Sequence, residues 1–248
     1  MKKLLSSVVC AVILLSTLST HNVLANESAN KSHVVESEGQ YEKRGYILEV
    51  INEVDNPAIN PIISDFVELY FDVYPKLLTK YSDPKTATKK VILKFDPTYD
   101  GVAYADDGMI VVSSKWILNH PWDLGLFTHE LTHIVQSYPR YDNETGWITE
   151  GIADYVRYVY GPHHEDWKFR EPKETDNYNS GYGETARFLL WIEQNKNNKV
   201  VEILNKQMQQ NTFHINVFKE ITGQSVEDLW AEYINNPYVK TKYKIKSE

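Results

Sequence analysis

Two histidines four residues apart, with a glutamate directly after the first, form the segment of this sequence that most suggests chemistry. They are His129, Glu130 and His133. On a helix, residues i and i+4 lie one above the other, so both imidazoles can bind one metal ion. Glu130 lies about 100° around the helix from His129, beside the position of a metal-bound water. The spacing therefore predicts a catalytic zinc site with Glu130 as general base.

The alternative interpretation is an ordinary helix whose two histidines bind nothing. So short a pattern has little chance of arising by accident in a chain with eight histidines. The flanking residues are apolar, as a buried active-site helix requires. These are Leu126, Phe127, Leu131, Ile134 and Val135. We therefore favour the zinc site.

A zinc site with two histidines needs a third protein ligand and an open position for water. Glu150 and Asp154 are again four residues apart, on a helix predicted one loop later. We predict Glu150 as the ligand, and Asp154 as acceptor for the second ring N–H of a liganding histidine. Three alternatives remain open. Asp154 itself could ligate, His163 or His164 could ligate, or both acids could face solvent.

Hydrolysis of an amide also needs a hydrogen-bond donor for the negative charge that develops on the carbonyl oxygen. The tyrosine-bearing turn 177–182 precedes another predicted helix. We predict Tyr182 as this catalytic donor, with Tyr178 as the alternative, although most tyrosines only pack. The segments 101–105 and 109–113 could supply an edge strand to which an extended peptide adds.

Hydrophobic spacing predicts the elements that position these residues. Apolar residues recur at helical spacing from Ile62 to Lys80, where Pro75 could introduce a kink. Asp106-Asp-Gly108 predicts a hairpin turn. Strands are expected at 46–51, 90–95, 101–105 and 109–113, and a long loop at 161–181. Further helices are expected at 124–137, 149–158, 184–194, 200–209 and 226–234. Asp123 is expected to cap the first of these helices. This order predicts an α+β domain in which a mostly antiparallel N-terminal sheet precedes a helical half, with a cleft between them.

The N-terminus has the pattern of a secretory signal peptide. Lys2 and Lys3 precede an apolar run from Leu4 to Leu18, and cleavage is expected after Ala25. The run is shorter than the roughly 20 residues that span a bilayer, which disfavours an uncleaved anchor. We expect a signal peptide at 1–25, a flexible leader at 26–43, one domain at 44–248, and an exported protein, periplasmic or extracellular.

Composition limits the chemistry and the partners. The only cysteine, Cys10, lies in the predicted signal peptide, so disulfides are not expected and any metal must use histidine and carboxylate ligands. The formal net charge of -8 disfavours nucleic acid and anionic membranes as partners. We expect a monomer without stable membrane insertion once the signal is cleaved.

Three motifs together resemble the basic secretory protein family, a family of secreted zinc metallopeptidases found in plants and bacteria. They are Thr128-His-Glu-Leu-Thr-His-Ile-Val-Gln136, Glu150-Gly-Ile-Ala-Asp-Tyr-Val-Arg157 and Ser180-Gly-Tyr-Gly-Glu-Thr-Ala-Arg-Phe-Leu189. The resemblance runs from about Tyr46 to Tyr233. It implies a zincin-like fold of the gluzincin type, with Zn²⁺ on His129, His133 and Glu150, and Glu130 as base. The family name refers to basic proteins, whereas this chain is acidic.

The resulting hypothesis is an exported zinc metallopeptidase that acts on a peptide or protein substrate. An aminopeptidase is a variant that needs an acidic anchor for the substrate amine, for which Glu144 or Glu165 could serve. The alternative hypothesis is a secreted binding protein for glycan or host protein, with the aromatic segment 167–182 as its recognition surface. Glu130 argues against that alternative, because a protein that only binds needs no base there.

Overall fold

The computed structural model describes residues 35–37, 39–82, 87–162 and 167–241. The predicted signal peptide, the leader up to residue 34, and His163, His164 and Glu165 lie outside the described residues. Within the described part, no helix is long and apolar enough to cross a membrane.

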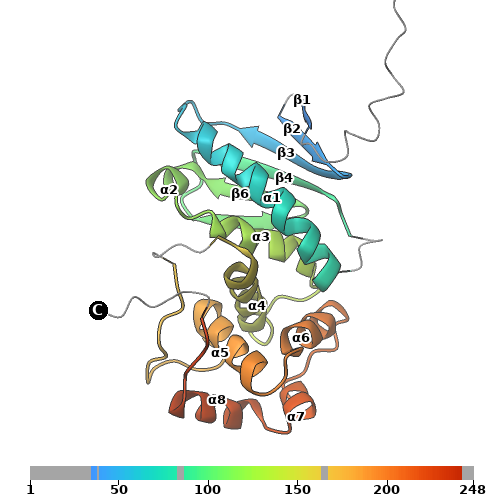
Figure 1. Ribbon diagram of the computed structural model, residues 1–248, viewed down its shortest axis with the longest axis vertical. Helices are drawn as coiled ribbons and strands as arrows, with labels where there is room; N and C mark the ends of the chain where they lie inside the picture. Colours follow the sequence, from blue (N-terminus) through green and yellow to red (C-terminus); the bar gives the residue numbers. More distant parts are fainter. Residues whose placement is uncertain (1–34, 38, 83–86, 163–166, 242–248) are drawn as a thin grey trace, which may run out of the picture. The chain divides into compact units, whose positions relative to one another are not determined.

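In the described residues, six strands form one mixed sheet in the order β1-β2-β3-β4-β6-β5 (Figure 1). Their bounds are β1 Val35–Ser37, β2 Gln40–Lys43, β3 Tyr46–Asn52, β4 Lys90–Asp96, β5 Ala103–Asp106 and β6 Met109–Ser113. Three of the five strand pairs are antiparallel, and the central strands β3, β4 and β6 run parallel. The centre thus differs from the mostly antiparallel sheet that we expected. The helix between β3 and β4 provides the crossover that a parallel pair requires.

The first two strands lie where the sequence suggests a flexible leader. The leader prediction is therefore wrong for Val35–Ser37 and Gln40–Lys43. No side chain of β2 is buried, so this strand shows no apolar alternation in the sequence. Gly45 adopts a positive φ of 77° in the turn that leads into β3. Backbone pairing holds this edge of the sheet, and Tyr41 adds a partly buried contact with the core.

The long helix α1 (Ile59–Tyr81) joins the sheet to the helical half. It is continuous through Pro75 and buries eleven residues along its length. The Phe66 ring lies edge-on to Phe95 of β4 at 5.6 Å and to Phe127 of α3 at 4.9 Å, measured between ring centroids. Because one ring touches both a strand and the next layer of helix, the site helix is fixed relative to the sheet.

Seven helices follow the sheet strands in the part of the chain that the structure describes, and Figure 1 shows α4 to α8 gathered beyond α3. Their bounds are α2 Ser114–Asn119, α3 Gly125–Gln136, α4 Gly146–Tyr160, α5 Tyr182–Asn195, α6 Val200–Gln209, α7 Val217–Thr222 and α8 Val226–Asn235. The predicted α+β class, with the two histidines on a helix of the helical half, is confirmed. The short helices α2 and α7 were not predicted, because six residues are too few to show a helical period.

Asp123 does not cap α3, so this detail of the prediction is wrong. The cap position is Leu124, and no side chain caps the helix there. The Asp123 carboxylate instead accepts hydrogen bonds from Arg157 at 2.7 Å and from the Trp116 indole at 2.9 Å. An ion pair with a residue 34 positions away outcompetes the local cap, because the buried guanidinium of Arg157 needs a charged partner.

Candidate metal centre

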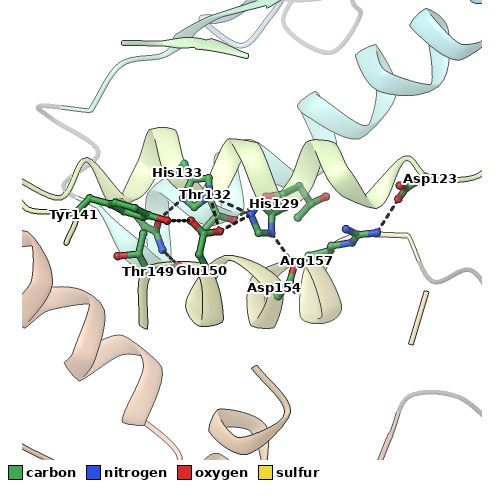
Figure 2. A network of polar contacts seen from close by, with 11 residues as sticks. Asp123, His129, Thr132, His133, Tyr141, Thr149, Glu150, Asp154 and Arg157 are labelled. Atoms are coloured by element: carbon green, nitrogen blue, oxygen red, sulfur yellow. Dashed lines mark hydrogen bonds and ion pairs between the residues drawn. The ribbon is translucent and has the colours of Figure 1, made fainter. Parts of the chain in front are cut away.

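The site lies between α3 and α4, whose facing sides carry the predicted residues (Figure 2). His129 and His133 extend from α3 toward Glu150 and Asp154 on α4. One ligand atom from each of His129, His133 and Glu150 lies within 4.8 Å of the others, an arrangement that could hold a metal ion. Asp154 does not belong to this group. The structure therefore brings together the predicted ligands and places Asp154 beside them.

The three possible ligand atoms converge closely. The Nε2 atoms of His129 and His133 are 3.1 Å apart. Oε2 of Glu150 lies 3.2 Å from the first of these nitrogens and 3.5 Å from the second. His129 and Glu150 are buried, at 7% and 8% exposed, and His133 is half-buried. The atoms thus form a compact triangle shielded from most of the solvent.

Hydrogen bonds at the far side of each ring decide which nitrogen carries the proton. Nδ1 of His129 lies 2.7 Å from the Asp154 carboxylate, which can only accept when ionised. Nδ1 of His133 lies 2.7 Å from Oε1 of Gln136, whose amide group donates to the Thr149 carbonyl at 2.9 Å. Both Nδ1 atoms therefore carry hydrogen in the neutral rings, and both Nε2 lone pairs point into the triangle.

The electrostatics of the triangle favour a bound positive charge. Burial by itself lowers the pKa of His129, but hydrogen bonds to Asp154 and Glu150 raise it to about 10. Burial raises the pKa of Glu150, but the two histidines outweigh this and hold it well below its ordinary value. Three acceptor atoms that face one another repel unless a proton or a metal ion lies between them.

Glu130 lies next to the triangle without being part of it. It follows His129 on α3, is 7% exposed and lines the same cleft as the three possible ligands. Burial raises the pKa of its carboxyl group, and the neighbouring histidines oppose this rise. A raised pKa brings a carboxylate closer to the range in which it can both accept and return a proton.

Tyr182, the predicted oxyanion donor, stands at the N-terminus of α5. Its ring is stacked over His129, with ring centroids 6.2 Å apart and an interplanar angle of 9°. The side chain is 54% exposed. Tyr178, the alternative, faces Glu227 with its hydroxyl, at 3.4 Å, and its ring contacts Trp147. The structure therefore brings Tyr182, but not Tyr178, to the histidines.

Tyr141 contacts the site although the sequence analysis did not select it. Its hydroxyl donates to Oε1 of Glu150 at 2.9 Å, on the carboxylate oxygen that faces away from the histidines (Figure 2). Burial and the neighbouring Glu150 raise the pKa of its hydroxyl to about 12. The signal in the sequence that could have indicated Tyr141 is its place in the short turn between α3 and α4, the helices that carry the possible ligands. Gln136 was also missed, although it lies one turn after His133 on the same helix face.

Hydrogen bonds of Thr185 fix the turn that positions Tyr182. The Thr185 hydroxyl donates to the Tyr178 carbonyl at 2.8 Å and accepts from the Gly181 N–H at 2.9 Å. Gly181 and Tyr182 have positive φ values of 82° and 43°. Thr185 also packs against Gly151 of α4, where an added Cβ would lie 2.2 Å from its methyl group. Gly151 thus allows α4 to pack closely against α5.

A cleft of about 1480 Å³ opens over the site, as predicted. Its lining includes His129, Glu130 and Glu150 on one side and residues 102–108 of the β5–β6 hairpin on the other. β5 is the edge strand of the sheet, so one side of it has no neighbouring strand in the described part. The cleft therefore combines a possible metal site with a strand edge.

The Arg157–Asp123 ion pair joins α4 to the residues that precede α3. Burial raises the pKa of Glu130, and the Arg157 charge acts to lower it. The Arg157 guanidinium lies 4.0 Å from the centroid of the Trp167 ring. Gly125 leaves room for it, because an added Cβ would lie 3.0 Å from Nε of Arg157. These contacts fix α4 to the first turn of α3, and so fix Glu130 relative to Glu150.

Comparison with known proteins gives one finding. The model of the basic secretory protein (BSP) family, described as peptidase of plants and bacteria, matches residues 49–233. No curated protein matches the chain. The matched range covers the central strands of the sheet, the possible metal ligands and all the helices up to Tyr233 of α8.

Proposed function

Because the chain belongs to the BSP family of plant and bacterial peptidases, we propose that it is an exported, zinc-dependent metallopeptidase. The observation that carries this proposal is the triangle of acceptor atoms from His129, His133 and Glu150. A structural role for such a site needs no neighbouring base, whereas Glu130 stands beside it in the same cleft.

The triangle fits zinc in both chemistry and size. Two imidazoles and one carboxylate are a common ligand set of catalytic zinc. Ligand atoms at about 2.0–2.1 Å from a tetrahedral zinc are about 3.3 Å from one another. The observed separations of 3.1, 3.2 and 3.5 Å agree with this value. When bound, zinc supplies a Lewis acid that polarises the peptide carbonyl and acidifies water.

The chain's own residues then move protons and stabilise charge. The Glu130 carboxylate takes a proton from the attacking water and passes it to the leaving amine nitrogen. The water oxygen bonds to the carbonyl carbon as the C–N bond breaks, so the products are a carboxylate and an amine. Tyr182 or Tyr141 donates a hydrogen bond to the carbonyl oxygen while it carries negative charge.

The β5 edge supports an extended peptide or protein as substrate. A chain added beside Ala103–Asp106 would gain backbone hydrogen bonds and lie over α3 in the cleft. Asp154 and Gln136 hold the two histidines, so the ligands would keep their orientation as substrate enters. The charged and apolar pattern of residues 1–25 supports export, and we propose that the mature protein acts as a monomer.

The proposal is tested by comparing wild type with Glu130→Gln, each loaded with zinc, on a mixed peptide library. The variant should keep one zinc per chain and lose at least about a hundredfold in kcat, since general base catalysis contributes roughly 10²–10⁴. Glu68→Gln makes the same change on an exposed position of α1 and should behave as wild type. If wild type and Glu130→Gln both hold zinc and both cleave nothing, the peptidase proposal fails and a binding protein replaces it.

A further inference from the structure

The size of the cleft is the first indication of whether it binds the interior or an end of a substrate chain. Its volume of about 1480 Å³ exceeds the roughly 300–1,000 Å³ of pockets for small ligands. It extends from the possible metal ligands past the end of α3 to Arg140, and along the hairpin to Gly108. A single residue at a chain end would leave much of this space to water.

The cations that line the described cleft are already paired with acids. Lys90 lies 2.6 Å from Glu49, and Arg157 lies 2.7 Å from Asp123. Arg140 is paired with both Asp142 and Glu144. Capture of a C-terminal carboxylate needs a cation that can change partner, and each of these would have to give up an existing ion pair.

The acids of the cleft are equally unsuited to hold an N-terminal amine. Glu144, one expected anchor, is paired with Arg140 and its side chain is 78% exposed. Asp106 and Asp107 lie exposed at the hairpin, where an ion pair with a substrate contributes little. Asp154 is engaged by His129. The buried acids in the described lining are Glu130, Glu150 and Asp154, and the proposed function already uses each of them as base, metal ligand or support of His129.

Exposed apolar side chains gather at this cleft. Seven large hydrophobic residues are exposed in the described part, and four of them line it: Val102, Tyr104, Tyr141 and Tyr182. Tyr104 lies within β5 and Val102 directly precedes this strand, so both exposed residues belong to the edge of the sheet. The Tyr104 ring rests edge-on against Tyr99, with centroids 5.1 Å apart, which fixes its orientation. Such a concentration of exposed apolar groups marks a binding surface.

We propose that the cleft binds the interior of an extended polypeptide that carries large apolar side chains near the bond to be cut, and that the protein is therefore an endopeptidase. The inference rests on the proposed peptidase function and specifies its substrate. A strand added to β5 places alternate substrate side chains beside Val102 and Tyr104, at the spacing of cross-strand pairs. Tyr141 and Tyr182 contribute apolar surface on the side of the metal ligands.

The first test uses one peptide sequence with a central aromatic pair in three forms: both ends blocked, free amine only, and free carboxylate only. Mass spectrometry locates each cut. We expect the same internal cut in all three, with kcat/KM values within about threefold. Removal of single residues from one free end, with the blocked peptide intact, would overturn the inference and leave the peptidase function standing. No cleavage of any form by zinc-loaded protein would instead contradict the peptidase function.

The second test measures binding without turnover. Zinc-loaded Glu130→Gln is titrated with the blocked aromatic peptide and with a copy in which serine replaces the aromatic pair. The aromatic peptide should bind at least about tenfold more tightly, because burial of its large apolar side chains on binding is favourable. Equal affinities for the aromatic and the serine peptide would overturn the apolar preference. The endopeptidase inference would still be decided by the first test.

Tyr104→Ser, made in the same Glu130→Gln protein, tests the strand edge directly. We expect it to weaken binding of the aromatic peptide about tenfold and to leave the serine peptide within about twofold. Tyr238→Ser removes a tyrosine that is 72% exposed and does not line the cleft, and it should change neither affinity. Equal losses in the Tyr104 and Tyr238 variants would overturn the role of Tyr104. Unchanged zinc content and melting temperature show that both variants are folded.

Discussion

The floor of the site and its rim are built in opposite ways. The floor consists of His129 and Glu150, which are buried, and His133, which is half-buried; Asp154 and Gln136 hold the two histidines from behind. The rim consists of Tyr141 and Tyr182, whose side chains are 67% and 54% exposed. Floor residues come from the interiors of two helices, whereas rim residues come from a turn and a helix end.

This difference indicates a division of work. Buried acceptors with fixed tautomers favour a metal ion, because little reorganisation is needed when it binds. Exposed tyrosines beside them can meet a substrate that enters from the solvent. We therefore expect floor substitutions to change metal binding first, and rim substitutions to change turnover with the metal in place.

Loss of the third ligand should have the largest effect. Glu150→Ala should lower zinc affinity by more than about a hundredfold, beyond the 10–100-fold that a supporting residue contributes, and activity should disappear with the metal. Zinc content after dialysis against a chelator measures this. Loss of metal in Asp154→Ala together with normal metal in Glu150→Ala would reverse the assignment of the ligand.

The rim should show the opposite pattern. Tyr182→Phe should keep its zinc and lose about a hundredfold in kcat if its hydroxyl stabilises the oxyanion. Tyr141→Phe should lower kcat and also weaken zinc binding by a few fold, because its hydroxyl touches the Glu150 carboxylate. Steady-state kinetics with parallel zinc titrations separates the two. Full activity in both variants would remove the rim from the mechanism.

Substitution of Asp154 or Gln136, which hold the two histidines of the floor, should have intermediate effects on zinc binding. Asp154→Ala and Gln136→Met each remove an acceptor from one histidine, and each should weaken zinc binding about 10–100-fold. Tyr238→Phe is a matched change outside the site and should leave zinc binding unaltered. If neither floor variant changes affinity, these hydrogen bonds do not orient the ligands.

The smallest expected effect is on stability of the metal-free protein. The pKa of His129 rises from 6.5 to about 10 on folding, so its stabilising contribution is complete below about pH 6.5 and declines toward pH 10. The melting temperature of metal-free protein should therefore fall across this range, and less so in Asp154→Ala. Zinc replaces the proton, so loaded protein should show little of this decline. A decline of the same size with zinc present would contradict the link to His129.

The sequence predicts the floor better than the rim for a physical reason. The i, i+4 spacing places His129 beside His133 and Glu150 beside Asp154 wherever those segments are helical. The contact of Tyr141 with Glu150 depends instead on an irregular turn, in which Arg140 is paired with Asp142 and Glu144. No periodic pattern encodes such a turn.

The same distinction applies to the fold. The hairpin around Gly108 and the long helix α1 follow from local signals, and both form as predicted. The parallel pairing of β3 with β4 and of β4 with β6 joins segments distant in the chain. The ion pair of Asp123 with Arg157 is equally distant, which is why the cap prediction failed. Short-range spacing does not specify long-range partners.

The contact between Gly151 and Thr185 links floor and rim mechanically. Gly151 follows the third ligand directly, and Thr185 holds the turn that presents Tyr182. One methyl group at position 151 would push α5 away from α4 and carry Tyr182 with it. The distance between the possible metal ligands and Tyr182 thus depends on a residue that belongs to neither. A search for altered specificity could begin at this buried glycine.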